Sequence, residues 1–268
     1  MPVVGDIVRF LDVFAPPELA ADWDNVGLLL GKSGAGVRRV MTCLTLTPDV
    51  AAEAIDEKVE LIVSHHPVMF RGIRKLTDAD AEGEMLLNLA ASGIAVYSPH
   101  TSFDSTRGGI NEQLAEAFGI NSAQPLRPIE NENCGGEGRW GELTSAVTLK
   151  SFCRIATEVL RTGYVEYCGL PEAPVRRVAL ACGAAGEFLE DAVRLQCDTF
   201  VTGEIRFHSV LQARTTGISL IVLGHYASER PAVEHLAAVI GAEFPELKVF
   251  AGRREADPLN VYTANTPE

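Results

Sequence analysis

The sequence lacks any apolar run approaching the roughly 20 residues that a membrane helix needs. Its N-terminus also has no basic segment followed by an apolar core. Basic residues are scarce, since 23 Lys and Arg stand against 36 Asp and Glu, which gives a formal charge of -13. An acidic body repels phosphate backbones. We therefore expect a cytoplasmic protein that contacts no membrane and is unlikely to bind nucleic acid through a broad basic face, although a local basic patch is left open.

Paired cysteines are missing as well. The six cysteines are scattered without a CxxC spacing, which excludes a zinc ribbon and a thioredoxin-type motif. Buried, reduced thiols are the simpler interpretation. What the sequence does have is 268 residues, of which 47% are hydrophobic. This is enough to bury the core of one large domain or of two modest domains, as expected of a soluble protein the size of an enzyme.

Strand-like and helix-like patterns alternate along the chain. In the first half, apolar runs alternate with segments of helical periodicity over 4–14, 37–46, 49–56, 61–64, 82–91, 94–97 and 110–118. Residues 121–141 are rich in Pro, Asn, Glu and Gly and indicate a loop-rich joint between domains. Beyond it the alternation resumes over 143–149, 151–160, 175–181, a helix reaching Leu195, and 199–201. The pattern predicts an α/β protein with two α/β units.

The adjacent histidines His65 and His66 directly follow the apolar run 61–64. A regular strand sends neighbouring side chains to opposite faces, so only a distorted strand end could aim both at one site. Two further apolar runs, 94–97 and 218–223, also lead into side chains that bind metals. Loops that leave the carboxyl ends of neighbouring parallel strands share one crevice. The pattern therefore predicts a metal site formed by His65, His66, Asp104, His225 and Glu229.

Each of these residues also has a simpler interpretation. A lone histidine at a strand end, such as His225, is more often a hydrogen-bonded loop residue than a ligand. Glu229 stands at the expected start of a helix that contains 231–239, where the helix dipole favours a carboxylate without any metal. Asp104 could form an Asx turn. Because His225 follows the second α/β unit, the chain must return to the first unit or place the site between the two, and both arrangements suit a ligand cleft.

Two turns give less specific signals. Segment 182–186 resembles a phosphate-binding turn, but it lacks the GxGxxG and GKS/T patterns, so close packing is the simpler interpretation. Thr202-Gly203-Glu204 ends another apolar run, and His208 lies four residues beyond Glu204. These residues could support metal ligands or form a general acid/base pair, and an ordinary capped turn is the alternative.

Five motifs occur in a fixed order along the chain. They are Trp23-Asp24-Asn25-Val26-Gly27-Leu28, Ser64-His65-His66-Pro67, His100-Thr101-Ser102-Phe103-Asp104 with Gly108-Gly109-Ile110-Asn111, Thr202-Gly203-Glu204, and Gly224-His225-Tyr226 with Ser228-Glu229. In these motifs and their order, the sequence resembles the NIF-three-like dinuclear metal-centre family, many members of which are named as homologues of a type 2 GTP cyclohydrolase I. The resemblance extends from about Val4 to Phe250.

The resemblance implies mixed sheets flanked by helices and a discontinuous first domain. That metal-site domain would comprise residues 1–124 together with 226–268, and a second α/β domain would comprise 125–225. The resemblance also implies a toroidal homohexamer with two divalent metal ions per chain. The family's ligands carry over onto His65, His66, Asp104, His225 and Glu229. One departure is Thr45, where many members carry an aspartate. The long middle insertion of larger members is also missing.

Nitrogen and oxygen ligands without a thiolate suit divalent ions such as Zn, Mn, Fe, Co or Ni. A bridging carboxylate, from Glu229 or Asp104, would hold two ions roughly 3.5 to 4 Å apart so that they activate a shared water. We predict metal-dependent hydrolysis of a nucleotide, a phosphoester or a related small molecule, with proton transfer by His100, Glu204 or His208. The alternative is a non-enzymatic metal-binding or regulatory interaction protein built on a hexameric ring.

Overall fold

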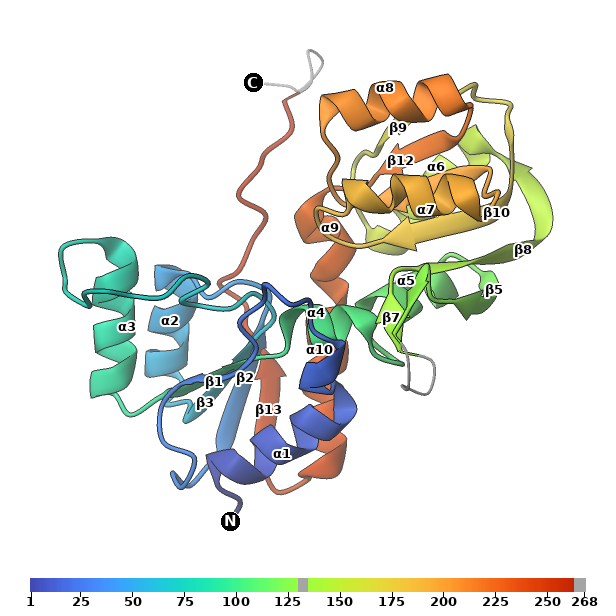
Figure 1. Ribbon diagram of the computed structural model, residues 1–268. Coiled ribbons are helices and arrows are strands. Elements are labelled where there is room, and N and C mark those ends of the chain that lie inside the picture. The colour runs from blue at the N-terminus through green and yellow to red at the C-terminus, as the bar shows by residue number, and fades with distance from the viewer. Residues whose placement is uncertain (130–134, 263–268) are drawn as a thin grey trace.

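The computed structural model describes residues 1–129 and 135–262. These residues form two α/β bodies, each built on its own mixed sheet with flanking helices (Figure 1). The predicted fold class is therefore confirmed. Within the described ranges, no helix is both long and apolar enough to cross a membrane.

The first sheet has five strands in the order β1-β4-β3-β2-β13. Their bounds are β1 Gly27–Leu30, β2 Arg39–Cys43, β3 Leu61–Ser64, β4 Ala95–Ser98 and β13 Lys248–Ala251. All neighbours pair in parallel except β1 and β4, which are antiparallel. Because β13 pairs with β2, a segment near the C-terminus completes a sheet that the first hundred residues begin.

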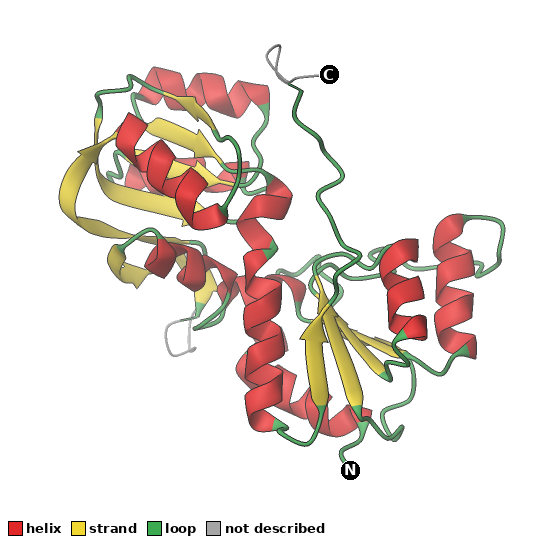
Figure 2. Cartoon of the chain, turned by 180° about the vertical axis from the view of Figure 1, so that it is seen from behind, coloured by secondary structure: helices red, strands yellow, loops and turns green. Residues whose placement is uncertain are grey.

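Helices cover both faces of this sheet (Figures 1 and 2). One face carries α2 (Pro48–Asp56) and α3 (Ala81–Ala91), and the other carries α1 (Val4–Phe14) and α10 (Pro231–Glu243). The apolar run of the central strand β3 is explained by its burial on both faces of the sheet. Leu61 and Val63 belong to the core on the α1 and α10 side, whereas Ile62 belongs to the core on the α2 and α3 side. A strand buried on both faces loses the alternation of a half-exposed strand.

The second sheet has six strands in the order β5-β8-β10-β11-β12-β9. Their bounds are β5 Ile120–Gln124, β8 Arg139–Thr148, β9 Glu166–Cys168, β10 Pro174–Ala181, β11 Thr199–Thr202 and β12 Ser219–Val222. The strands β10, β11 and β12 are parallel, and the outer strands pair antiparallel. The core on one face includes side chains of α5 (Ile110–Ala117) and α6 (Leu149–Leu160), and the core on the other includes those of α7 (Leu189–Arg194) and α8 (Phe207–Thr216).

Short elements complete the fold. They are η1 Pro17–Leu19, α4 His100–Ser105, η2 Gly186–Phe188, α9 His225–Glu229, and the paired strands β6 Arg127–Pro128 and β7 Gly136–Glu137. The loop-rich joint expected over 121–141 is therefore partly wrong, because most of β5, the pair β6–β7 and the start of β8 lie there, while residues 130–134 lie outside the described residues. The division into 1–124 with 226–268 and 125–225 stays a prediction.

The ends of strands from both sheets converge between the two bodies. His65 and His66 directly follow β3, and α4 begins two residues after β4, in the first sheet. In the second sheet, β12 ends just before α9, which carries His225 and Glu229 (Figure 1). The candidate site therefore lies between the two bodies, which was one of the two arrangements that the sequence left open.

Candidate metal centre

His65 and His66, which directly follow β3, both face the carboxylate of Glu229. Their backbone N–H groups donate to the carbonyls of Cys43 and Leu44, which fixes both residues against the end of β2. The Ser64 hydroxyl turns back and donates to the His66 carbonyl at 2.8 Å. The two imidazole centroids lie only 5.0 Å apart, with planes at 51°. The predicted strand-end geometry is therefore what the structure shows.

The carboxylate of Glu229 lies among three imidazoles. Its Oε2 atom is 3.0 Å from His66 Nε2, 3.1 Å from His225 Nε2 and 3.9 Å from His65 Nε2. His225 and Glu229 are four residues apart in α9, so both project from one face of the helix. Burial alone would raise the pKa of Glu229, but hydrogen bonds with His225 and His66 hold that pKa well below its usual range. The site therefore has a buried, ionised carboxylate at its centre.

His65 is buried without a hydrogen-bond partner in the described part of the chain. Only 1% of its side chain is exposed, and both ring nitrogens are unpaired. Its Nε2 lies 3.6 Å from Asp104 Oδ1, too far for a hydrogen bond. Two metal–ligand bonds of about 2.1 Å at the tetrahedral angle would separate the ligand atoms by about 3.4 Å. Burial keeps the pKa of His65 well below its ordinary value, which favours the neutral ring that binds metals.

Asp104 joins the site from α4 and contacts the second sheet. The Cys182 thiol donates to Asp104 Oδ1 at 3.2 Å, and Asn111 bridges the two residues through the Asp104 carbonyl and the Cys182 N–H. Burial, followed by the nearby charge of Glu229, raises the pKa of Asp104 to about 7. A divalent cation would relieve this repulsion between carboxylates. The sequence had placed Cys182 only among the buried thiols and in the turn 182–186.

Two overlapping groups of side chains could each hold a metal ion. One comprises His65, His66 and His100, and the other comprises His66, His225 and Glu229, with the ligand atoms of each within 4.8 Å of one another. His66 belongs to both groups. Asp104 lies outside these two groups but faces His65. His100, which the sequence predicted as a proton-transfer residue, could therefore also act as a metal ligand.

Three of the four histidines have an outer ring nitrogen held by an oxygen atom. The pairs are His66 Nδ1 with Thr45 Oγ1 at 2.7 Å, His100 Nδ1 with Asp24 Oδ1 at 2.7 Å, and His225 Nδ1 with Glu204 Oε1 at 3.1 Å. Such partners orient the rings of metal-binding histidines, and leave Nε2 directed into the site. Thr45 contacts a site histidine through its hydroxyl. Glu204 fits the supporting role that the sequence allowed for it.

Asp24 is a site residue to which the sequence had assigned no role. Its carboxylate is fully buried and accepts hydrogen bonds from His100 and from the Thr101 N–H. Burial opposes ionisation, but the hydrogen bonds from His100 and Thr101 outweigh it and lower the pKa of Asp24 to about 2. His100 itself has a φ of 27°. An aspartate within a shared motif was the available signal, but its contact with His100 spans 76 residues of sequence.

His208, the third predicted proton-transfer residue, lies away from the candidate metal ligands. It lies exposed in the first turn of α8, where its ring contacts Phe207. Within the described ranges, no contact joins its side chain to the other candidate residues. The proton-transfer role of His208 therefore stays a prediction.

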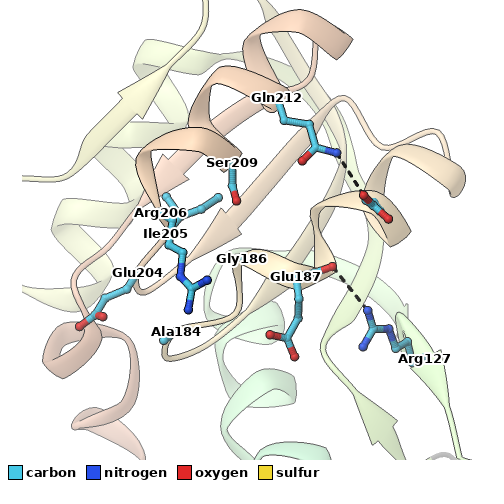
Figure 3. Close-up of a pocket in the computed structure, with 10 residues that line it drawn as sticks. Arg127, Ala184, Gly186, Glu187, Glu204, Ile205, Arg206, Ser209 and Gln212 are labelled. Atoms are coloured by element: carbon cyan, nitrogen blue, oxygen red, sulfur yellow. Dashed lines mark hydrogen bonds between the residues drawn. The ribbon is translucent and has the colours of Figure 1, made fainter.

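A polar cavity of about 790 Å³ adjoins the centre through Glu204 (Figure 3). It lies between the turn after β10 and the start of α8, with Arg206, Ser209 and Glu187 among its lining residues. Cavities of this size admit small molecules. The adjacent turn at Gly183 packs tightly, because a Cβ atom there would lie 2.4 Å from Glu229 Oε1. This supports the close-packing interpretation of segment 182–186.

Metal binding is expected to release protons. A hydrogen bond with Glu229 raises the pKa of His225 to about 9, and burial raises that of Asp104 to about 7. At pH 7 the metal-free site therefore holds a proton on His225 and a fraction of one on Asp104, whereas ligands must be unprotonated. We expect roughly one to two protons to be released per chain, and affinity to rise with pH up to about 9. Calorimetry in two buffers of different ionisation enthalpy measures this, and identical enthalpies in both would contradict it.

The fold and the site define an α/β protein with a buried histidine–carboxylate cluster that could hold metal ions. The family model Duf34/NIF3 (NGG1p interacting factor 3) matches residues 2–258, and the chain belongs to this family. The GTP cyclohydrolase 1 type 2 homolog of Clostridium acetobutylicum is 33% identical over 233 residues, or 86% of either chain. The protein NIF3 homolog of Schizosaccharomyces pombe is 36% identical over 260 residues, or 91% of this chain and 92% of the relative.

Solved structures show the same fold. A Bacillus cereus protein related to NIF3 superposes with a TM-score of 0.89 at 19% identity, covering 97% of this chain and 99% of that one. The family resemblance that the five motifs indicated is confirmed.

Proposed function

We propose that this protein is a dinuclear metal-dependent hydrolase that acts on a nucleotide, a phosphoester or a related small molecule. The observation that carries the proposal is the buried Glu229 carboxylate facing the Nε2 atoms of three imidazoles, one of which, His65, has no hydrogen-bond partner among the described residues. The two overlapping ligand groups support two ions rather than one. Nitrogen and oxygen donors favour Zn, Mn, Fe, Co or Ni.

In this proposal, different residues bind the metal ions, transfer protons and orient the ligands. The ions would be held by His65, His66, Asp104, His225 and Glu229. Bound divalent ions supply a Lewis acid and an activated water. Asp24 holds His100 through its Nδ1 atom, which leaves Nε2 to exchange a proton with a substrate atom. Glu204 orients His225 and borders the polar cavity beside the centre.

The assembly that we propose is the toroidal homohexamer implied by the family resemblance. The competing function is a non-enzymatic metal-binding or regulatory role on that ring. It is supported by the family's description as an NGG1p interacting factor. The two functions share one metal centre and differ in whether a substrate is turned over.

Elemental analysis together with a hydrolysis screen separates the two. We expect about two metal ions per chain in the wild type, and loss of both metal and phosphoesterase or nucleotide-hydrolysing activity in the His65→Ala/His225→Ala variant. His235→Ala, which removes an exposed histidine from α10, is the matched control and should retain both. Two metals without turnover of any substrate would favour the non-enzymatic role. Protein that was prepared with an excess of metal and still contains none would refute the site.

A further inference from the structure

Two large aromatic side chains lie exposed at the rim of the metal centre. Trp23 is 61% exposed and Phe70 is 48% exposed. Their ring centroids lie 5.8 Å apart, with planes inclined at 57°. Aromatic rings contribute much of the apolar area that proteins bury. Two adjacent rings that stay in water do not contribute this burial to the stability of the fold. Exposed apolar patches of this kind are typical of recognition surfaces.

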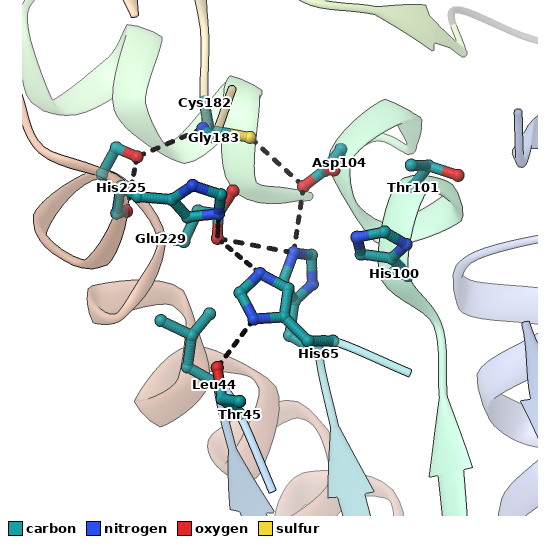
Figure 4. A network of polar contacts seen from close by, with 12 residues as sticks. Leu44, Thr45, His65, His100, Thr101, Asp104, Cys182, Gly183, His225 and Glu229 are labelled. Carbon is teal, nitrogen blue, oxygen red and sulfur yellow. Dashed lines mark hydrogen bonds and ion pairs between the residues drawn. The ribbon is translucent and has the colours of Figure 1, made fainter. Parts of the chain in front are cut away.

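The pair borders the candidate site directly. The His100 ring lies 6.0 Å from the Trp23 ring and 6.3 Å from the Phe70 ring, in edge-on arrangements. On its other side, the His100 ring lies 5.2 Å from the His65 ring. His100 is thus at the edge of the polar network (Figure 4), and this imidazole, which belongs to one of the two groups that could hold a metal ion, contacts the aromatic pair. Within the described ranges, Trp23 and Phe70 are the exposed aromatic side chains that make such contacts with these histidines.

The backbone beside each ring is fixed while the rings face outward. Next to Trp23, the buried Asp24 is anchored to His100 and Thr101. Asn25 Nδ2 donates to the Met69 carbonyl at 3.0 Å, which ties the Trp23 segment to the Phe70 segment. The pair is therefore organised before any ligand arrives, which lowers the entropy cost of binding.

Exposed cations follow Phe70 along the chain of an otherwise acidic protein. Phe70 is followed by Arg71, Arg74 and Lys75, all exposed, and none of the three forms an ion pair with any described residue. Phe70, Arg71 and Lys75 also line a cavity of about 340 Å³, whose lining includes Asp80 and Glu82 as well. The chain as a whole carries a charge of -13. Unpaired cations beside aromatic rings favour an anionic ligand that carries a ring.

We propose that Trp23 and Phe70 form a binding platform for the planar heteroaromatic ring of a small phosphorylated ligand, with its phosphate directed toward the metal centre. The inference rests on the proposed function and narrows its substrate class from nucleotides, phosphoesters and related small molecules to phosphorylated ligands that carry such a ring. Stacking on aromatic side chains tolerates many ring types, because every heteroaromatic ring presents a π-face.

Fluorescence of Trp23 tests the platform without requiring turnover. The chain has two tryptophans, so Trp140→Phe leaves Trp23 as the sole reporter, and phenylalanine retains a ring beneath the Arg177 guanidinium. The metal-loaded variant is titrated with AMP and with ribose 5-phosphate, which lacks the ring. We expect AMP to change Trp23 emission and to bind at least about fivefold more tightly than ribose 5-phosphate.

Phe70→Ala should lower the affinity for AMP about fivefold and leave the affinity for ribose 5-phosphate unchanged. Phe207→Ala, which removes another exposed ring, is the matched control and should change neither. Equal affinity for the two ligands would overturn the platform. So would a Trp23 emission change upon diluting the protein alone, since a second copy of the chain would then cover the pair. Failure to hydrolyse any phosphoester would refute the proposed function and leave this ligand preference measurable.

Discussion

Replacing Glu229 with glutamine is expected to abolish metal binding at this centre. The substitution keeps the size of a side chain that is only 3% exposed, but removes the charge that faces His65, His66 and His225. The amide can present only one acceptor atom, and its NH₂ group cannot coordinate a cation. Loss of a partner of a ligating residue commonly costs 10–100-fold in metal affinity, so loss of the central carboxylate should cost more than about 100-fold.

Metal titration by calorimetry and thermal unfolding with and without added Zn or Mn measure this effect. Ions that bind only the folded chain raise its unfolding temperature, and that rise should vanish in Glu229→Gln. Glu234→Gln is the matched control, because Glu234 is 59% exposed and pairs with Arg230 on the outside of α10. A Glu229→Gln protein that still binds two ions with unchanged affinity would remove Glu229 from the ligand set.

The residues that the sequence could identify share a local signal. The pair His65-His66 stands at the end of an apolar run, and parallel strands direct such ends to one edge. The same reasoning applies to His225, although its strand belongs to the second sheet. Spacing within a short helix explains why Glu229 faces the same site as His225. Contrary to the expectation from the sequence, however, Glu229 ends the separate helix α9 and does not stand at the start of α10.

Two of the residues that orient the histidines, Asp24 and Thr45, could not be found in this way, whereas Glu204 could, because it follows the end of an apolar run. Asp24, Thr45 and Glu204 reach their histidines from positions 76, 21 and 21 residues away, respectively. Neither periodicity nor strand-end position predicts a contact of that kind, which depends on how separate loops pack. The contact of Cys182 with Asp104 could not be predicted either, because it forms only when the second sheet lies against α4. The fold class was easier to predict, since it depends on alternation repeated along the whole chain.

Replacing Gly183 with alanine is expected to disrupt the centre from the side of the second sheet. Gly183 has a φ of +63°, and an added Cβ atom would lie 2.4 Å from Glu229 Oε1 and 3.6 Å from His225 Nε2. The Gly183 N–H also bonds to Ser228 Oγ at 3.2 Å, which holds the turn against α9. Glu229 must therefore move. We expect metal affinity to fall by about 10–100-fold, and the unfolding free energy by about 1–2 kcal/mol from the left-handed backbone alone.

Gly217→Ala separates the backbone strain from the contact with the site. Gly217 has a similar φ of +79°, but no atom lies within 4 Å of the position of its Cβ. This variant should lose comparable stability while retaining wild-type metal affinity, as measured by denaturant unfolding and metal titration on the same preparations. Equal metal affinity in the Gly183 and Gly217 variants would mean that the second sheet does not position Glu229. A selective loss in Gly183→Ala would show that the centre depends on close packing between the two bodies as well as on its ligands.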